Sequence, residues 1–431
     1  MNPSSPRLQP WTVWGLAALF VVYNYVQQVA PGVIAADLAQ AFQVSAGALG
    51  TIAAFYFYAY AALQIPVGLT VDRFGPHRPL AVAIATAAVG SLAFSWAGSA
   101  GAAQYSRLLI GAGAAFSFIA CLKLASNWFA PGLFATLAGL TNTAGMVGAA
   151  LGGAPLAALV RTTGWRGAMG LLAGAAAALA VLVLLLVRDR PPGAEALPDD
   201  QGKTPASGGL RRGAWAVVAN RQGWLNAVYA TAISIVFVAF GALWGTTYVE
   251  KVYGLDTVAA SGTVSMLFFG AIAGSLFFGW FSDRIRRRRA PMIVAAIGGL
   301  FAMAAILYLP VLPLVALKAL LAALGFFCSA NIISYAVAHD LCPPERAGLA
   351  LGFLNTCYYA GSAISQPLVG WLLDTRAPRP GAGLAALTAA DFRFALSAVV
   401  GCLALSLVAA LLLEETHDRA TESPAAPAGK K

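Results

Sequence analysis

The sequence contains little charge. Asp, Glu, Lys and Arg make up only 10% of its 431 residues, against roughly 25% in a soluble globular protein. A water-facing surface cannot be built from so few charged side chains, which excludes a cytosolic enzyme. The five cysteines form no CxxC pair and there are only three histidines, so we expect no disulfide scaffold, no metal and no other cofactor. An apolar content of 59% also excludes a disordered chain.

Long apolar runs dominate what is present. A helix needs about 20 mostly apolar residues to cross a lipid bilayer. The chain contains twelve such runs, at 11–35, 46–71, 79–98, 102–128, 133–160, 165–187, 223–249, 257–281, 290–309, 312–338, 346–372 and 391–413. The sequence therefore predicts an all-α integral membrane protein with twelve transmembrane helices.

The positive charges are distributed unevenly between the two sides of the membrane. If the N-terminus is cytoplasmic, 18 Lys and Arg residues lie in segments on that side and 6 on the opposite side. Because Lys and Arg are retained on the cytoplasmic side, both termini are predicted to be cytoplasmic. The net charge of +10 is then explained by orientation, so we expect membrane lipid as a partner and no nucleic acid.

An internal repeat divides the chain into two halves. Gly68, Asp72 and Arg73 follow the second run, and Gly279, Asp283 and Arg284 follow the eighth at one offset of 211 residues, which also carries Arg107 onto Lys318. A shared offset indicates a duplicated six-helix unit. We expect six-helix bundles at 1–187 and 223–414, a cytoplasmic linker at 188–222 and a disordered tail at 415–431.

The same residues carry a resemblance to a known family. Gly68-x-x-x-Asp72-Arg73-x-Gly75-Pro76-His77-Arg78 is similar to the signature loop of the major facilitator superfamily of secondary transporters, and Arg107-x-x-x-Gly111-x-Gly113 resembles its fourth-helix motif. The likeness spans the chain and extends to proteobacterial members, although Gly153 stands where the antiporter motif has proline. It implies a monomeric alternating-access carrier of the bacterial inner membrane, which is not an enzyme.

The resemblance also assigns a conformational gate to the signature loops. In the family this loop holds the cytoplasmic side closed, and Asp72 can form a charge cluster with Arg73 and Arg78. The alternative is that the arginines only set topology and contact anionic lipid. The predicted gate residues are Gly68, Asp72, Arg73, Gly75, Arg78, Gly279, Asp283 and Arg284.

Three cations lie inside the predicted spans, where charge is costly and marks functional candidates. Arg107 and Lys318 occupy equivalent positions in the two halves, so we expect them on opposite walls of one cavity, where an anionic or zwitterionic solute neutralises both. The alternative is that each reaches the outer lipid headgroups. Lys123 lies nearly opposite Arg107 on its helix, and its role stays open.

Uncharged polar residues form stripes at helical spacing. Asn355, Tyr358, Tyr359, Ser362 and Gln366 share one face of the eleventh run, and Tyr56, Tyr60 and Gln64 recur every four residues in the second. These stripes line a pathway or join helices to one another. The predicted substrate-binding residues are Arg107, Lys318, Tyr56, Tyr60, Gln64, Asn24, Gln28, Trp244, Asn355 and Tyr359.

No Asp or Glu lies in the middle of a predicted span, which disfavours drug-cation/proton antiport. A proton remains a candidate partner through Asp37 or Glu250 near the outer ends of their runs. We expect inward transport of a small polar solute, an organic anion, amino acid or peptide. The alternatives are a drug or metabolite efflux carrier of the same fold and a transporter-like solute sensor.

Overall fold

The computed structural model describes residues 9–191, 215, 217–343, 346–379 and 383–416. The first half of this chain forms helices α1 (Gln9–Val33), α2 (Ala35–Phe42), α3 (Ala46–Phe74), α4 (His77–Ser95), α5 (Ala100–Ala114), α6 (Ser117–Trp128), the short η1 (Pro131–Leu133), α7 (Phe134–Leu151) and α8 (Ala154–Leu186). The second half forms α10 (Arg221–Ile235), the π-helical segment η2 (Val236–Trp244), α11 (Gly245–Tyr253), α12 (Thr257–Val264), α13 (Met266–Ile285), α14 (Arg289–Tyr308), α15 (Leu314–Cys328), η3 (Ser329–Ile332), α16 (Ile333–Asp340), α17 (Ala347–Asp374), η5 (Leu384–Ala386) and α18 (Ala389–Leu412).

Ten helical stretches in the described residues, some of them made of two or three consecutive elements, are long and apolar enough to cross a membrane. The helices α7 and α17 occupy the positions of the fifth and eleventh predicted runs, so each of the twelve runs has a helical counterpart. Several spans are broken within their length, as at the junction of α5 with α6 and along η2. Most of the predicted linker and tail, at 192–214, 216 and 417–431, lies outside the described residues.

Local sequence explains where the second span begins and ends. The Ser45 side chain accepts a hydrogen bond from the Ala48 N–H and caps the N-terminus of α3. At the other end Gly75 adopts a φ of +76°, which glycine tolerates best, and Pro76 follows it. A similar glycine, Gly164 with φ +72°, interrupts α8 between the fifth and sixth predicted runs.

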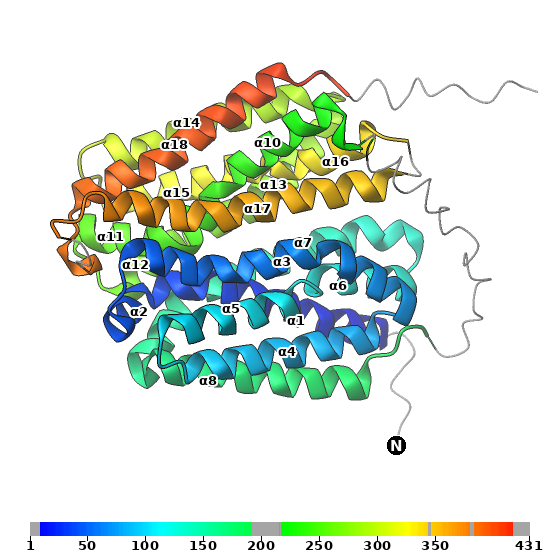
Figure 1. The fold of residues 1–431 in the computed structure, drawn as a ribbon. Coiled ribbons are helices and arrows are strands. Elements are labelled where there is room, and N and C mark those ends of the chain that lie inside the picture. Colours follow the sequence, from blue (N-terminus) through cyan, green and yellow to red (C-terminus); the bar gives the residue numbers. More distant parts are fainter. Residues whose placement is uncertain (1–8, 192–214, 216, 344–345, 380–382, 417–431) are drawn as a thin grey trace, which may run out of the picture.

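The helices α1–α8 and α10–α18 form two stacked groups, which we call the N half and the C half (Figure 1). They meet mainly where α3 packs along α17, α1 along η2, α7 along α13 and α8 along α12. One end of the molecule carries α2, α11 and the N-terminus of α3, and we call it the Asp374 end. The opposite end carries the two signature loops, and we call it the loop end (Figure 1).

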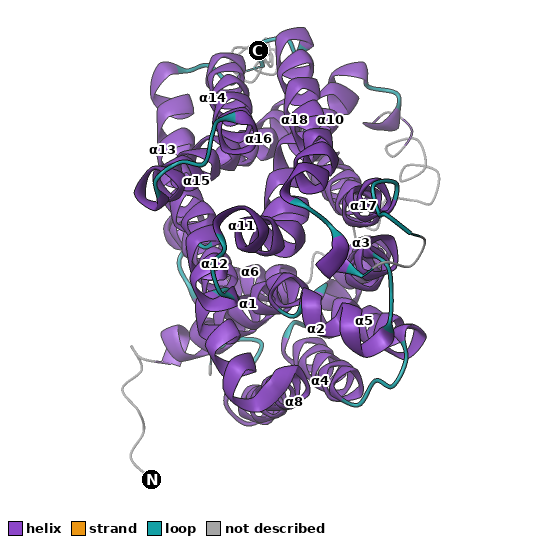
Figure 2. Ribbon diagram, turned by 90° about the vertical axis from the view of Figure 1, so that its left-hand side faces the viewer, coloured by secondary structure: helices purple, strands orange, loops and turns teal. Residues whose placement is uncertain are grey.

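The two halves are joined tightly at the Asp374 end. The carboxylate of Asp374, the last residue of α17, accepts hydrogen bonds from the backbone N–H groups of Ala46 and Gly47, both at 2.9 Å, and from Ser45 Oγ at 2.7 Å. A C-half acid therefore caps the N-terminus of an N-half helix, where the free N–H groups and the helix dipole favour an anion. Figure 2 views this end and shows α3 beside α17.

Close backbone approaches complete this closure. A Cβ atom on Gly50 of α3 would lie 2.5 Å from the carbonyl oxygen of Gln366 in α17. A Cβ atom on Gly32 of α1 would lie 2.5 Å from the carbonyl oxygen of Ala242 in η2. Glycine is thus required where the two halves cross, and any larger side chain would push them apart.

Candidate functional site

A cavity of about 440 Å³ lies between the two halves, on the loop-end side of their closest contacts. The residues that line it come from both halves and include Tyr60, Gln64, Asn355 and Tyr359, four of the predicted substrate-binding residues. A deeper recess of about 80 Å³ continues toward the Asp374 end and is bordered by Gln28, a fifth. The two spaces share Tyr25, Asn142, Ser275, Ile332, Tyr335 and Tyr359.

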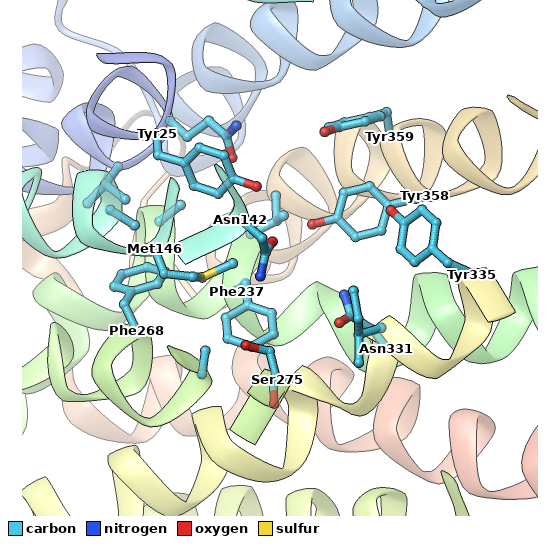
Figure 3. A pocket seen from close by; sticks show the side chains of 18 residues that line it. Tyr25, Asn142, Met146, Phe237, Phe268, Ser275, Asn331, Tyr335, Tyr358 and Tyr359 are labelled. Atoms are coloured by element: carbon cyan, nitrogen blue, oxygen red, sulfur yellow. The ribbon is translucent and has the colours of Figure 1, made fainter. Parts of the chain in front are cut away.

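Tyrosines and amides set the chemistry of these walls. Tyr25 and Asn142 of the N half lie across the recess from Tyr335, Tyr358 and Asn331 of the C half (Figure 3). The rings of Tyr60 and Tyr359 meet between the halves with centroids 4.0 Å apart. The described lining of both spaces contains no charged side chain. Such walls suit a small solute with an apolar body and several hydrogen-bonding groups.

Arg107 lies one layer behind this lining. Its side chain is only 1% exposed. The Nη1 atom donates a 2.7 Å hydrogen bond to the backbone carbonyl of Gln27, and the guanidinium carbon lies 4.9 Å from the centroid of the Tyr56 ring. Nε and Nη2, which share one edge of the guanidinium, have no hydrogen-bond partner among the described residues. This edge binds a carboxylate or phosphate in bidentate geometry, with two parallel hydrogen bonds.

A polar cluster separates Arg107 from the recess. The Tyr56 hydroxyl donates to Asn24 Oδ1, and Gln28 Nε2 lies 3.5 Å from the Tyr56 hydroxyl and 3.4 Å from Asn24 Oδ1. Asn24 Nδ2 donates to Ser117 Oγ at 2.8 Å. Of this cluster only Gln28 reaches the recess. Gln28, Asn24 and Tyr56 therefore cover the cation with neutral groups in this conformation.

Lys318 does not join Arg107, contrary to the expected pairing across one cavity. It is half-buried on α15, lines neither space, and makes no ion pair or hydrogen bond with a described residue. The backbone carbonyl equivalent to that of Gln27 is Val238 O, which already accepts a 3.0 Å hydrogen bond from Gln366 Nε2. Trp244 is also fully buried away from both spaces and donates to the Gln366 carbonyl at 3.2 Å.

The signature loops make ion pairs within their own halves. The Asp72 carboxylate is 2.7 Å from Lys123 Nζ rather than in a cluster with Arg73 and Arg78, and this pair is exposed. Asp283 lies 2.6 Å from Arg288 Nη1, while Arg73, Arg78 and Arg284 are exposed. A Cβ on Gly68 or Gly279 would meet no atom within 4 Å. In the described residues no hydrogen bond or ion pair joins the predicted gate residues across the halves.

Each signature loop is instead held by an acid that follows the last helix of its own half. Asp189, just past α8, accepts a 2.8 Å hydrogen bond from the His77 N–H at the start of α4. A Cβ on Gly75 would lie 2.7 Å from the same carboxylate. Glu415, just past α18, accepts from the Arg288 and Arg289 N–H groups at the start of α14. Neither acid belongs to a motif of the sequence, and neither was predicted to contact a signature loop.

Several cavity residues were also missed. Tyr25, Asn142, Ser275, Asn331 and Tyr335 line the cavity or its recess and were not predicted. Asn142 and Ser275 are the single polar residues that α7 and α13 present there, so periodicity could not find them. Tyr25, in contrast, lies three residues before Gln28 in α1, and Asn331 lies four residues before Tyr335, so helical spacing did carry a signal for these three. Tyr335 donates to Asn355 Oδ1 at 2.9 Å, which links a missed residue to a predicted one.

The two acids considered for proton coupling lie near the Asp374 end. Asp37 is in α2 and Glu250 in α11, and both are half-buried. Burial raises the pKa of the Asp37 carboxyl. Within the described ranges, no three His, Cys, Asp or Glu side chains are grouped in a way that could hold a metal ion.

Two helical bundles around a central solute-sized cavity define the class of membrane transporters built from paired repeats. The Major Facilitator Superfamily model matches residues 16–366 and 263–431, and the chain belongs to this family. It is therefore a multi-pass membrane protein of a transporter family rather than an enzyme, and the predicted twelve-helix fold is confirmed.

Two relatives and one solved structure illustrate the likeness. The chain is 26% identical over 379 residues to "Membrane sensor protein UhpC" of Salmonella typhimurium, covering 84% of this chain and 83% of that protein. It is 23% identical over 381 residues to "Probable sulfoacetate transporter SauU" of Cupriavidus necator, covering 84% and 87%. A crystal structure of a bacterial homolog of the human lysosomal transporter Spinster, inward-facing and unoccupied, matches with a TM-score of 0.76 at 17% identity, covering 99% and 100%.

Proposed function

We propose that this protein is an alternating-access carrier of the bacterial inner membrane that moves a small organic anion into the cell. The observation that carries the proposal is the buried Arg107, whose Nε and Nη2 edge has no partner among the described residues. A buried charge is costly unless it is paired, so an oxyanion from the substrate is the missing partner. The name of the sulfoacetate transporter SauU, an anion carrier, supports the same substrate class.

The path to Arg107 passes through Gln28. This side chain borders the recess and contacts both Asn24 and Tyr56, and the Tyr56 ring lies against the guanidinium. We infer that the anionic group displaces the Gln28 amide and takes its place beside Tyr56. The rest of the substrate then lies among Tyr25, Asn142 and the C-half tyrosines, where hydroxyl and amide groups bind its polar atoms.

The orientation belongs to the proposal as well. The Lys and Arg distribution favours a cytoplasmic loop end and cytoplasmic termini. The cavity then faces the cytoplasm, while Asp374 closes the outer end. Each half is taken to move as one bundle, with 1–187 and 223–414 as the two units and 188–222 as their linker.

The test is uptake into proteoliposomes of carboxylates, sulfonates, sugar phosphates, amino acids, dipeptides and neutral sugars. We expect an anion to be transported and to raise the melting temperature, since a ligand of the native state stabilises it. Arg107→Gln should abolish both effects without lowering the melting temperature of the free protein, because it removes a buried charge that lacks a carboxylate. Undiminished anion uptake by Arg107→Gln would contradict the proposal.

The similarity to UhpC favours a second candidate, a sensor that binds a solute without moving it. The same experiment separates the two. A sensor would show the anion-dependent rise in melting temperature and its loss in Arg107→Gln, yet no uptake into proteoliposomes. A carrier shows both binding and uptake.

A further inference from the structure

The carbonyl group that holds Arg107 is free because of a proline. In an α-helix the carbonyl of residue i accepts a hydrogen bond from the N–H of residue i+4. The residue four positions after Gln27 is Pro31, which lies inside α1 and has no N–H. The proline ring also crowds the carbonyl four residues earlier and turns it away from the helix axis. The Gln27 carbonyl is therefore left to accept from outside α1.

Arg107 takes this free acceptor. Its Nη1 donates to Gln27 O at 2.7 Å, across from α5 to α1. A carbonyl is a neutral anchor, so it fixes the guanidinium without cancelling the positive charge. The bond uses Nη1 and leaves the Nε and Nη2 edge unpaired. A carboxylate anchor would fix the side chain equally well but would remove the reason for an anion to bind.

We propose that Pro31 is a positioning residue for substrate binding. Because it removes one N–H from α1, it leaves the Gln27 carbonyl as a neutral anchor that orients Arg107. The bidentate edge of Arg107, Nε and Nη2, then stays available for an oxyanion. This inference rests on the proposed function, because it concerns how the same anion site is built. It adds the reason why the site lies beside α1, and it names a residue that does not itself contact the solute.

The C half offers an internal comparison. The 211-residue offset carries Gln27 onto Val238 and Pro31 onto Ala242. Ala242 keeps its N–H, but η2 is π-helical and its hydrogen bonds join residues five apart, so this N–H is not the partner of the Val238 carbonyl, which accepts from the neutral side chain of Gln366. The equivalent cation, Lys318, stays half-buried with no described partner. A cation is held beside the carbonyl only in the half that has the proline.

Pro31 has a neighbour that could give it a different role. Gly32 crosses η2 so closely that a Cβ would lie 2.5 Å from Ala242 O, at a contact between the halves. Pro31 could therefore act as a bend that shapes this crossing. The two roles differ in chemistry, since the anchor depends on the absent N–H whereas the bend depends on the proline ring.

The experiment compares Pro31→Ala with the α-hydroxy acid analogue of alanine, lactic acid, introduced at position 31 by nonsense suppression. Alanine restores the N–H. The analogue puts an ester oxygen there, and so lacks both the N–H and the ring. Pro66→Ala in α3, an exposed helix-interior proline, serves as the matched control. Each variant is measured in proteoliposomes with the anion identified by the uptake screen, and its melting temperature is recorded.

We expect Pro31→Ala to raise KM about tenfold, the effect of weakening one charge-assisted hydrogen bond, with Vmax and melting temperature maintained. The lactic acid variant and Pro66→Ala should keep the KM of the unmodified protein. If KM rises equally in Pro31→Ala and in the lactic acid variant, or if only Vmax falls, Pro31 acts by bending α1. Either result overturns the proposal that it acts by removing an N–H. Unchanged KM in Pro31→Ala while Arg107→Gln abolishes uptake overturns this inference alone, whereas intact uptake in Arg107→Gln overturns the proposed function with it.

Discussion

The N half and the C half share one plan but place charge differently. In both halves an acid just past the last helix, Asp189 or Glu415, caps the helix that follows the signature loop. In the centre of the molecule the N half holds a buried cation against the Gln27 carbonyl, and the C half holds a neutral amide, Gln366, against the equivalent Val238 carbonyl. The two halves thus share the scaffold, but at this position in the described residues only the N half holds a buried cation.

The Asp374 end differs between the halves in the same way. The N-terminus of α12 is capped by its own Asp256, which accepts from the Ala259 N–H at 2.8 Å. The equivalent helix, α3, has Ser45 as its own cap and Asp374 as a second cap from the C half. At this end the C half caps its helix with its own acid, whereas the N half also uses an acid of the C half. Substitutions made in matched pairs test each of these differences between the two halves.

The largest effect is expected from exchanging the two equivalent cations. Arg107→Lys keeps the charge but removes the Nε and Nη2 edge, so uptake efficiency should fall about 30-fold, which corresponds to about 2 kcal/mol. Lys318→Arg should change it less than twofold, because Lys318 borders neither described space. Initial rates of anion uptake measure both. Equal losses of uptake in the two variants would show that Arg107 and Lys318 both bind the anion, as the symmetry of the repeat predicts.

The next effect concerns the closed end. Asp374→Ala removes three hydrogen bonds to one carboxylate across the halves and should shift the conformational equilibrium away from the Asp374-closed state by about 2 kcal/mol. Spin-label distances between α2 and η5 should lengthen in a larger fraction of molecules. Asp72→Ala is the control at the loop end, where the acid is 68% exposed and pairs within its own half. If Asp72→Ala shifts the conformational equilibrium equally, Asp374 has no specific role in holding that end closed.

A smaller effect is expected at the neutral anchor. Gln366→Leu removes the donor to Val238 O and should lower thermal stability by about 1 kcal/mol. Anion KM should remain within twofold of the unmodified protein, since Gln366 lines neither described space. The measurements are a melting curve and an uptake curve on the same preparation. A large rise in KM would move part of the substrate site into the C half beside Gln366.

The smallest effect is expected at Lys123. Its ion pair with Asp72 is 41% and 68% exposed, and solvent-exposed pairs contribute less than about 1 kcal/mol. Lys123→Ala should therefore leave melting temperature and KM almost unchanged. This residue is the third cation inside a predicted span, so the variant tests whether position in a span alone makes a cation functional. Loss of anion binding in Lys123→Ala would make it a second binding cation.

The helices were predictable because lipid leaves few alternatives. Every backbone polar group in the membrane must be paired, so a run of 20 apolar residues becomes a helix regardless of its neighbours. In α3 the helical spacing of Tyr60 and Gln64 places them on one face, and both side chains line the cavity. Tyr56, on the same face one turn away, lies behind the wall instead.

The unpredicted features depend on contacts between distant segments. The offset that pairs Arg107 with Lys318 treats the halves as equal, but the anchor of Arg107 depends on Pro31, whose counterpart is Ala242. Asp374 was recognisable only as an acid at the end of a run, because its partners lie more than 300 residues earlier. Asp189 and Glu415 look like ordinary loop acids until the chain folds back on them.

The separation between Asp374 and its partners also orders the assembly of the protein. The N–H groups of Ala46 and Gly47 are made early in synthesis, whereas the carboxylate that caps them arrives only with the end of the eleventh span. Until that point the N half has the cavity wall and Arg107 but no seal at its Asp374 end. The barrier between the two membrane faces is therefore finished by one of the last segments to be inserted, so a chain that stops early cannot retain a sealed carrier.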